Sequence, residues 1–145
     1  MDSVVARVIA HRAHAGQLDR FDEYVIEHVE RVAQAVSGDI RPLAYLHDVL
    51  EASDIKPKEL RAYGLTHVEF LVLDLLTRRP GEPYRRHVTR IARATGEAGR
   101  FARISKRADL DDHLRHTQMP ARAPDYEWAK REIARAQDRK RELAR

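Results

Sequence analysis

The sequence contains no cysteine, which excludes disulfides, thiolate zinc sites and thiol nucleophiles. A metal site in this chain must therefore use histidine and carboxylate ligands. Glycine and proline are also scarce, with six of each among 145 residues, and they fall between segments of helical periodicity rather than inside them. This pattern predicts an all-α protein.

The sequence also has no long apolar run. No segment approaches the ~18 apolar residues of a membrane span. The N-terminal stretch MDSVVARVIAHRAHAG carries an acid at Asp2 and a base at Arg7, unlike a signal peptide. We therefore expect a cytoplasmic protein without a membrane partner. The formal charge of +4 at pH 7 comes from 27 basic and 23 acidic residues, which permits an anionic ligand and does not require one.

Apolar residues at helical spacing predict a series of helices separated by turn residues. The predicted helices are, in chain order, one ending near Gly16, one ending at Gly38, one capped by Asp39 and running to about Ala52, one opened by Pro57, one opened by a capping box at Thr66 to Glu69, one from Tyr84 to a break around Gly96 to Gly99, a long one through Leu114, and a last one capped by Asp125. We expect one domain at 1–118. At 119–145 we expect a linker, marked by Pro120 and Pro124, and an amphipathic helix packed on the domain or on a partner.

Three ionisable residues interrupt the apolar segment LAYLHDVLEASD, namely His47, Asp48 and Glu51. Buried charge is costly unless it is paired or bound to a metal. His28 and Asp109 lie on other predicted helices, and helices of a bundle can bring such side chains to one point. Two imidazoles and two carboxylates suit Mn²⁺, Fe²⁺ or Zn²⁺, so the sequence predicts one divalent ion in the bundle.

Each of these residues also has an ordinary structural interpretation. His28 could lie on a helix surface. His47 and Asp48 could make a hydrogen bond between helices, and Asp109 could be a solvated member of an acidic turn. Glu51 lies one turn from Asp48, so it could face the same cavity or face water.

The order of these residues resembles the H…HD…D signature of the HD-domain metal-dependent phosphohydrolases. The surrounding sequence is similar to their alarmone-hydrolase branch, which comprises the (p)ppGpp hydrolase domains of bifunctional alarmone synthetase/hydrolases and the small alarmone hydrolases. The matching blocks lie between Val4 and Leu114 and are AHAGQ at 13–17, YVIEHVERVA at 24–33, LAYLHDVLEASD at 43–54, LVLDLLTRRPGEPY at 71–84 and KRADLDDHL at 106–114.

The resemblance implies a single-domain helical bundle that hydrolyses the 3′-pyrophosphate of (p)ppGpp with one divalent ion, in the first instance Mn²⁺. It places the metal ligands at His28, His47, Asp48 and Asp109. It implies catalytic roles for Glu51, Asp48 and Asp54, and substrate contacts at Arg20, Lys106, Asp112 and His113.

The chain departs from the branch at three points. The acidic ED pair after HD is Glu51 followed by Ala52, with Asp54 nearby. The basic turn before the first ligand is LDRFDEYV, in which only Arg20 is positively charged, and the last Asn of the branch is His113. A catalytically impaired nucleotide-binding module and a hydrolase of another nucleotide phosphate are therefore alternatives. We expect a nucleotide or another phosphate ester as the ligand and leave a homo-oligomer open. Acids interrupt the basic C-terminal helix, which argues against nucleic acid.

Overall fold

The computed structural model describes residues 1–116 and 123–142, and these fold into nine α-helices and a short 3-10 helix without a β-strand. The all-α prediction is confirmed. The elements are α1 (Ser3–Ala13), α2 (Val25–Gln34), η1 (Gly38–Ile40), α3 (Arg41–Leu46), α4 (Val49–Ala52), α5 (Pro57–Ala62), α6 (His67–Leu76), α7 (Tyr84–Arg93), α8 (Gly96–His116) and α9 (Ala123–Arg139). None of the described helices combines the length and hydrophobicity that a membrane span needs.

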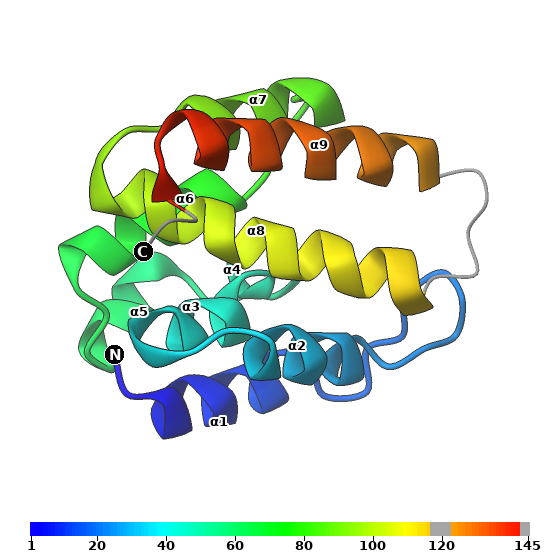
Figure 1. The fold of residues 1–145 in the computed structure, drawn as a ribbon. Coiled ribbons are helices and arrows are strands. Elements are labelled where there is room, and N and C mark those ends of the chain that lie inside the picture. The colour runs from blue at the N-terminus through cyan, green and yellow to red at the C-terminus, as the bar shows by residue number, and fades with distance from the viewer. Residues whose placement is uncertain (117–122, 143–145) are drawn as a thin grey trace.

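Helix α8 runs through the middle of the molecule, with α1, α2 and α3 on one side and α7 and α9 on the other (Figure 1). It contacts α2, α6, α7 and α9. The core is apolar and includes the fully buried side chains of Val29, Val32, Leu43, Leu46 and Leu110. Because α8 has neighbours on several sides, polar side chains on its inner faces must find partners on other helices.

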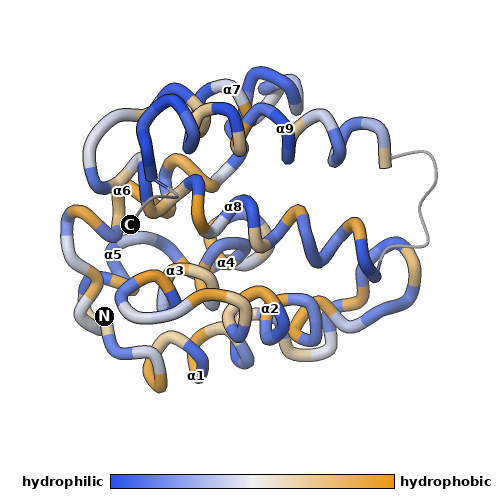
Figure 2. Tube along the Cα trace, viewed as in Figure 1, coloured by the Kyte–Doolittle hydropathy of each residue, from blue (hydrophilic) through white to orange (hydrophobic). Residues whose placement is uncertain are grey.

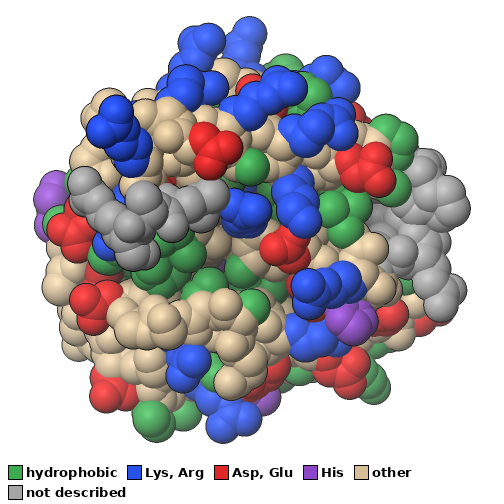
Figure 3. Space-filling view, in the orientation of Figure 1, with side chains coloured by type: hydrophobic (Ala, Val, Ile, Leu, Met, Phe, Trp, Pro, Cys, Tyr) green, Lys and Arg blue, Asp and Glu red, His purple; other side chains and the backbone are tan. Residues whose placement is uncertain are grey.

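Helix α9 packs against α7 and α8 through a narrow stripe formed by Ala129, Ile133 and Ala136. The rest of the helix is mostly hydrophilic (Figure 2), and lysine and arginine side chains gather over α7 and α9 (Figure 3). The helix begins at Ala123, so Asp125 lies in its first turn and is not the predicted cap. Pro120 and the predicted boundary between 118 and 119 lie outside the described residues.

The predicted helix over 39–52 is interrupted at His47 and Asp48, which lie between α3 and α4. The side chain of His47 explains the break. Its Nδ1 donates to the carbonyl oxygen of Ala44 at 2.6 Å, which is the acceptor that the amide of Asp48 would use in a continuous helix. The expectation of one continuous helix is therefore wrong, because a histidine side chain competes with the backbone for this carbonyl.

Two further expectations about this region are wrong. Helix α2 ends at Gln34 rather than at Gly38, and Asp39 does not cap the next helix. Gly38 adopts a φ of +58°, in the left-handed region that glycine favours, and starts the 3-10 turn that contains Asp39. The cap position of α3 falls on Ile40, which makes no side-chain capping bond.

Other helix starts are as predicted. Pro57 is the first residue of α5. The capping box at the start of α6 is confirmed, because Thr66 Oγ1 accepts from the amide of Glu69 at 3.2 Å and Glu69 Oε1 accepts from the amide of Thr66 at 2.9 Å. The segment at 78–83 is the loop that connects α6 to α7.

The break between α7 and α8 falls at Ala94 and Thr95, slightly before the predicted position, and Gly99 is part of α8. A Cβ atom on Gly99 would lie 2.3 Å from the carbonyl oxygen of Ala94. The two helices can therefore approach this closely only because residue 99 has no side chain.

We expect Gly99→Ala to destabilise the protein, because backbone has to move to remove this clash. Overpacking of this kind typically costs about 1–3 kcal/mol in the free energy of unfolding. Urea denaturation measures the change, and Glu97→Ala, at an exposed position in the same turn of α8, serves as the control with an expected change within about 0.5 kcal/mol. Equal stability of the two variants would contradict the tight approach.

Candidate metal centre

Side chains from three parts of the fold converge on the carboxylate of Asp109 on α8. His28 comes from α2, and its Nε2 lies 2.9 Å from Asp109 Oδ1. His47 comes from the α3–α4 junction, and its Nε2 lies 3.5 Å from the same oxygen and 3.2 Å from Asp48 Oδ2. The structure thus brings together all four residues that the sequence singles out as metal ligands.

The imidazole of His47 is held with one nitrogen directed at this cluster. Because Nδ1 donates to the carbonyl of Ala44, Nε2 is left with a lone pair in the neutral ring. Nε2 is buried and faces the carboxylates of Asp48 and Asp109, but it makes no well-formed hydrogen bond to a described residue. Buried polar atoms rarely stay unpaired. A lone pair next to two carboxylates is an arrangement that fits a cation.

His28 presents a related problem, because both of its ring nitrogens face carboxylates. Nδ1 donates to Asp112 Oδ2 at 2.6 Å, while Nε2 faces Asp109 Oδ1. A neutral imidazole carries only one proton, so the second nitrogen needs either another proton or a bound cation. Nε2 of His28 is therefore a candidate ligand atom.

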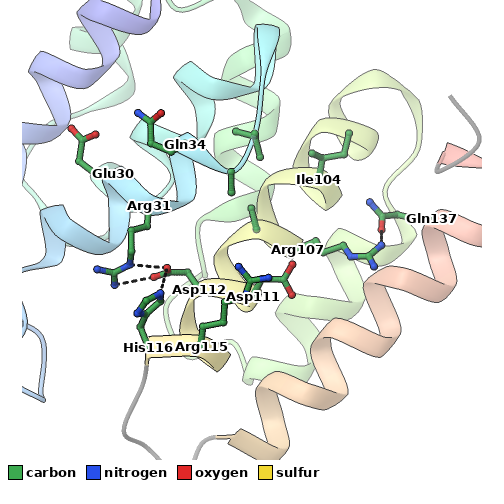
Figure 4. A pocket seen from close by; sticks show the side chains of 13 residues that line it. Glu30, Arg31, Gln34, Ile104, Arg107, Asp111, Asp112, Arg115, His116 and Gln137 are labelled. Atoms are coloured by element: carbon green, nitrogen blue, oxygen red, sulfur yellow. Dashed lines mark hydrogen bonds and ion pairs between the residues drawn. The ribbon is translucent and has the colours of Figure 1, made fainter.

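Arg31 on α2 holds Asp112 in place. Its Nε and Nη2 donate to the two carboxylate oxygens at 2.7 and 3.1 Å, as Figure 4 shows. Burial raises the pKa of Asp112, but the bonds from His28 and Arg31 outweigh this effect and lower the pKa to about 2. Carboxylates that accept from the second nitrogen of a ligating histidine fix the orientation of its ring. Asp112 and Arg31 are therefore positioning residues for His28.

The cluster requires positive charge beside its carboxylates. Burial lowers the pKa of His28, but hydrogen bonds to Asp109 and Asp112 outweigh burial and raise it to about 9. The pKa of His47 also lies well above its usual value, because nearby carboxylates overcome its burial. Burial raises the pKa of Asp109, but Lys106 and the surrounding imidazoles lower it far below its usual value. Protons or a metal ion can supply this positive charge.

His113 is a further ligand-type residue that sequence reasoning placed only among the substrate contacts. Its Nε2 lies 3.2 Å from Asp109 Oδ1, and its ring stacks on His28 with centroids 4.3 Å apart. Ligand atoms of His28, Asp109 and His113 lie within 4.8 Å of one another, as do those of His28, His47 and Asp48. The i, i+4 spacing of Asp109 and His113 on one helix could have indicated this from the sequence.

A cavity of about 260 Å³ adjoins the cluster. Three of the predicted substrate contacts line it, namely Arg20, Lys106 and His113. It is also lined by Arg78, which the sequence offers as an arginine beside a loop that could attract an anion, and by four residues that sequence reasoning missed, which are Tyr84, His87, Ser105 and Tyr126. These residues come from the loop after α6 and from α7, α8 and α9. Arg78 and Tyr84 fall in the block at 71–84, but nothing in the sequence marks the five as neighbours.

Glu51, for which the resemblance implies a catalytic role, lines the same cavity. Its Oε1 accepts from the backbone amide of Arg78 at 2.8 Å, which ties α4 to the loop after α6. The carbonyl of Ala52 accepts from Gln17 Nε2 at 2.7 Å, so the glutamine of the AHAGQ block anchors the end of α4. Ala52 is not among the residues that line the cavity.

Two predicted site residues, Asp54 and Asp112, do not line the cavity beside Glu51. Asp54 lines a separate cavity together with Arg12 and Tyr63, because the chain turns away from the cluster after α4 ends. Asp112 lines a cavity between α2, α8 and α9 and not the one beside Glu51. The structure does not bring these two residues into the cavity beside Glu51, and the roles expected for them in catalysis and substrate binding stay predictions.

We expect Asp112→Asn to weaken Mn²⁺ binding by about 10–100-fold, the range typical of lost partners of metal ligands. The neutral amide no longer balances Arg31 and orients His28 less firmly. Asp111→Asn is the matched control, since Asp111 pairs with Lys130 at 2.7 Å and does not contact the cluster. Calorimetric titration of the metal-free proteins with Mn²⁺ gives both affinities, and equal values would contradict the positioning role.

No protein-family model and no curated protein matches this sequence. The resemblance to HD-domain phosphohydrolases accordingly stays a prediction from the sequence blocks that lie between Val4 and Leu114. The geometry of the cluster does not depend on that resemblance. Imidazoles and carboxylates from α2, α8 and the α3–α4 junction form two groups of possible ligands that share His28, and a polar cavity adjoins them.

Proposed function

We propose that the chain is a divalent-metal-dependent phosphohydrolase that acts on a nucleotide. The observation that carries the proposal is the buried, unpartnered Nε2 of His47, which faces the carboxylates of Asp48 and Asp109 at the edge of a cavity that Lys106 and two arginines line. A centre for a cation beside a cavity for an anion is the arrangement that metal-assisted phosphate chemistry requires. By resemblance, the 3′-pyrophosphate of (p)ppGpp is the first substrate to test.

In this proposal His28, His47, Asp48 and Asp109 hold the ion, and His113 is a candidate fifth ligand. Nitrogen and oxygen ligands without thiolate suit Mn²⁺, Fe²⁺ or Zn²⁺, and a site with five ligand-type residues favours a metal that accepts more than four ligands, such as Mn²⁺ or Fe²⁺. When bound, such an ion lowers the pKa of a water ligand and polarises a phosphoryl oxygen.

The residues of the chain supply the other requirements of hydrolysis. Lys106 donates to Asp109 Oδ2 at 2.9 Å and stays protonated, because Asp109 and Tyr84 raise its pKa against the effect of burial. Its positive charge, with those of Arg20 and Arg78 along the cavity, offsets the charge of a phosphate. Glu51 lines the same cavity and is the carboxylate available to accept and return a proton.

A nucleotide-binding module without turnover is the second candidate. Two features favour it, namely the bond from Glu51 Oε1 to the amide of Arg78, which occupies one of its oxygens, and the alanine at position 52, where the resembled branch has the second acid of its ED pair. Hydrolysis of a different nucleotide phosphate is the third. Metal binding is common to all three, so turnover separates the first and third candidates from the second.

Protein purified without chelator should contain about one divalent ion per chain, by the ligand count of one site. Metal should also raise the melting temperature, because a ligand at 100 times its Kd stabilises the folded state by about 2.7 kcal/mol. Asp48→Ala should abolish both effects. Asp54→Ala should preserve both, since Asp54 lines another cavity. Elemental analysis and thermal melts measure these properties, and a metal-dependent melting shift that survives Asp48→Ala contradicts the proposed ligand set.

The Mn²⁺-loaded protein should release phosphate or pyrophosphate from at least one substrate in a panel of (p)ppGpp, NADPH, deoxynucleotides and nucleoside monophosphates. Glu51→Gln should lower turnover by about 10²–10⁴-fold, the usual share of proton transfer. The glutamine oxygen can still accept from Arg78, so the loop and the metal content should not change. Binding of a nucleotide without turnover by the parent protein would favour the binding module.

A further inference from the structure

Two residues that line the cavity beside the metal centre carry buried hydroxyl groups without a hydrogen-bond partner in the described part of the chain. Tyr84 Oη, from the first residue of α7, and Ser105 Oγ, from the middle of α8, are both buried and unpaired among the described residues. Both residues line the cavity that also contains Lys106 and Glu51. Buried hydroxyls are hydrogen-bonded in most proteins, so two unpaired hydroxyls at one cavity indicate that a binding partner is missing there.

The chemical state of Tyr84 at neutral pH makes it a donor. Burial raises the pKa of its phenol to about 12, against the opposing effect of Lys106. Lys106 lies beside its ring, with Nζ 5.9 Å from the ring centroid. The phenol therefore keeps its proton and can donate a hydrogen bond near an ammonium group.

His87, one turn after Tyr84 on α7, supplies a third donor. Arg90 Nη2 lies 3.2 Å from Nδ1, and because a guanidinium can only donate, this contact favours the tautomer with the ring proton on Nε2. Glu82 Oε1 lies 3.6 Å from Nδ1 but already accepts from Arg90 at 3.0 Å. Burial and the charges of Lys106 and Arg90 lower the pKa of His87 to about 4, so the ring is neutral. Nε2–H makes no hydrogen bond to another described residue, and His87 lines the cavity.

These groups call for a ligand rich in acceptors and negative charge. The Nε2–H of His87 can only donate. Lys106, Arg20 and Arg78 line the cavity together with the carboxylates of Asp48, Glu51 and Asp109, of which Asp48 and Asp109 are proposed metal ligands. With a divalent ion on those two carboxylates, the remaining charge of the lining favours an anion. The cavity of about 260 Å³ is smaller than the roughly 300–1,000 Å³ of pockets that enclose a whole drug-sized ligand. It suits one end of a nucleotide, and the part with the most acceptors is a phosphoryl group.

We propose that Tyr84, Ser105 and His87 form a phosphoryl-binding wall, in which the two hydroxyls and the Nε2–H donate to the non-bridging oxygens of the substrate phosphate. The inference rests on the proposed function, because that function brings a phosphate to this cavity. It assigns substrate binding to Tyr84, His87 and Ser105, for which the sequence alone predicts no role. A water molecule that satisfies the two hydroxyls for purely structural reasons is the competing explanation.

The test compares Tyr84→Phe and Ser105→Ala, each of which deletes one oxygen atom, with the parent protein. Tyr63→Phe is the matched control, because Tyr63 is exposed and lines another cavity. Isothermal titration calorimetry with inorganic phosphate is run on metal-free protein and on protein loaded with Mn²⁺. We expect each of the two variants to bind phosphate about 10-fold more weakly, as for a lost hydrogen bond to a charged group, while Tyr63→Phe binds like the parent.

The melting temperature without phosphate separates binding from structure. Deleting an unpaired buried hydroxyl removes a desolvation cost, so Tyr84→Phe and Ser105→Ala should melt at the same temperature as the parent or higher. Lower melting temperatures with unchanged phosphate affinity would show a structural water and overturn the proposal. A parent protein that binds no phosphate in either metal state would also overturn it.

Turnover distinguishes this inference from the proposed function. If the parent hydrolyses a nucleotide and neither variant changes KM or the phosphate affinity, the phosphoryl-binding wall is wrong while the hydrolase proposal stands. If the parent hydrolyses nothing, yet both variants weaken phosphate binding, the wall stands and the hydrolase proposal fails. Metal content, measured in every variant, should equal that of the parent, since neither hydroxyl belongs to the proposed ligand set.

Discussion

The buried carboxylate of Asp109 is the constraint around which this bundle is arranged. It lies on the central helix α8, and desolvating a charge there is costly unless other groups compensate. The ammonium group of Lys106 donates to one carboxylate oxygen of Asp109 and offsets this cost, and the imidazoles of His28 and His113 lie next to the other oxygen. A leucine at position 109 would avoid the electrostatic cost, so the polar cluster is better explained by binding than by stability.

The same constraint explains two local irregularities. The helix over 39–52 breaks at His47, because the imidazole bonds back to Ala44 and directs its Nε2 at the cluster. Asp112 on α8, held by Arg31 on α2, fixes the ring of His28. In both places the side chain that faces the cluster is oriented by a hydrogen bond behind it, which is how proteins prepare a histidine for a metal.

The C-terminal helix belongs to the environment of the site. Tyr126 on α9 stacks on His113 with ring centroids 4.9 Å apart and an interplanar angle of 14°, and it meets Tyr84 edge to face at 6.1 Å. The helix is held on α7 and α8 by a stripe of small and branched side chains. Residues beyond the last motif therefore help to shape the cavity, although they resemble none of the motif blocks.

Much of the fold could be predicted, because helical periodicity, the capping box at Thr66 and scarce glycine and proline act locally. The convergence of His28, His47 and Asp109 could be expected because ligand-type residues recur on separate amphipathic helices. The break at His47 could not, since it depends on one side chain competing for a backbone carbonyl. The cavity wall was also missed, because Tyr84, His87 and Ser105 acquire their significance only from the packing of α7 against α8.

The most direct test of the central claim is a crystal structure of the protein grown with Mn²⁺, with anomalous diffraction measured above the manganese absorption edge. The account predicts one strong anomalous peak within bonding distance of Nε2 of His28 and His47 and of carboxylate oxygens of Asp48 and Asp109. A strong peak at another place would contradict it. So would the absence of a peak in crystals in which His28 still bonds to Asp109 and His47 still bonds to Ala44.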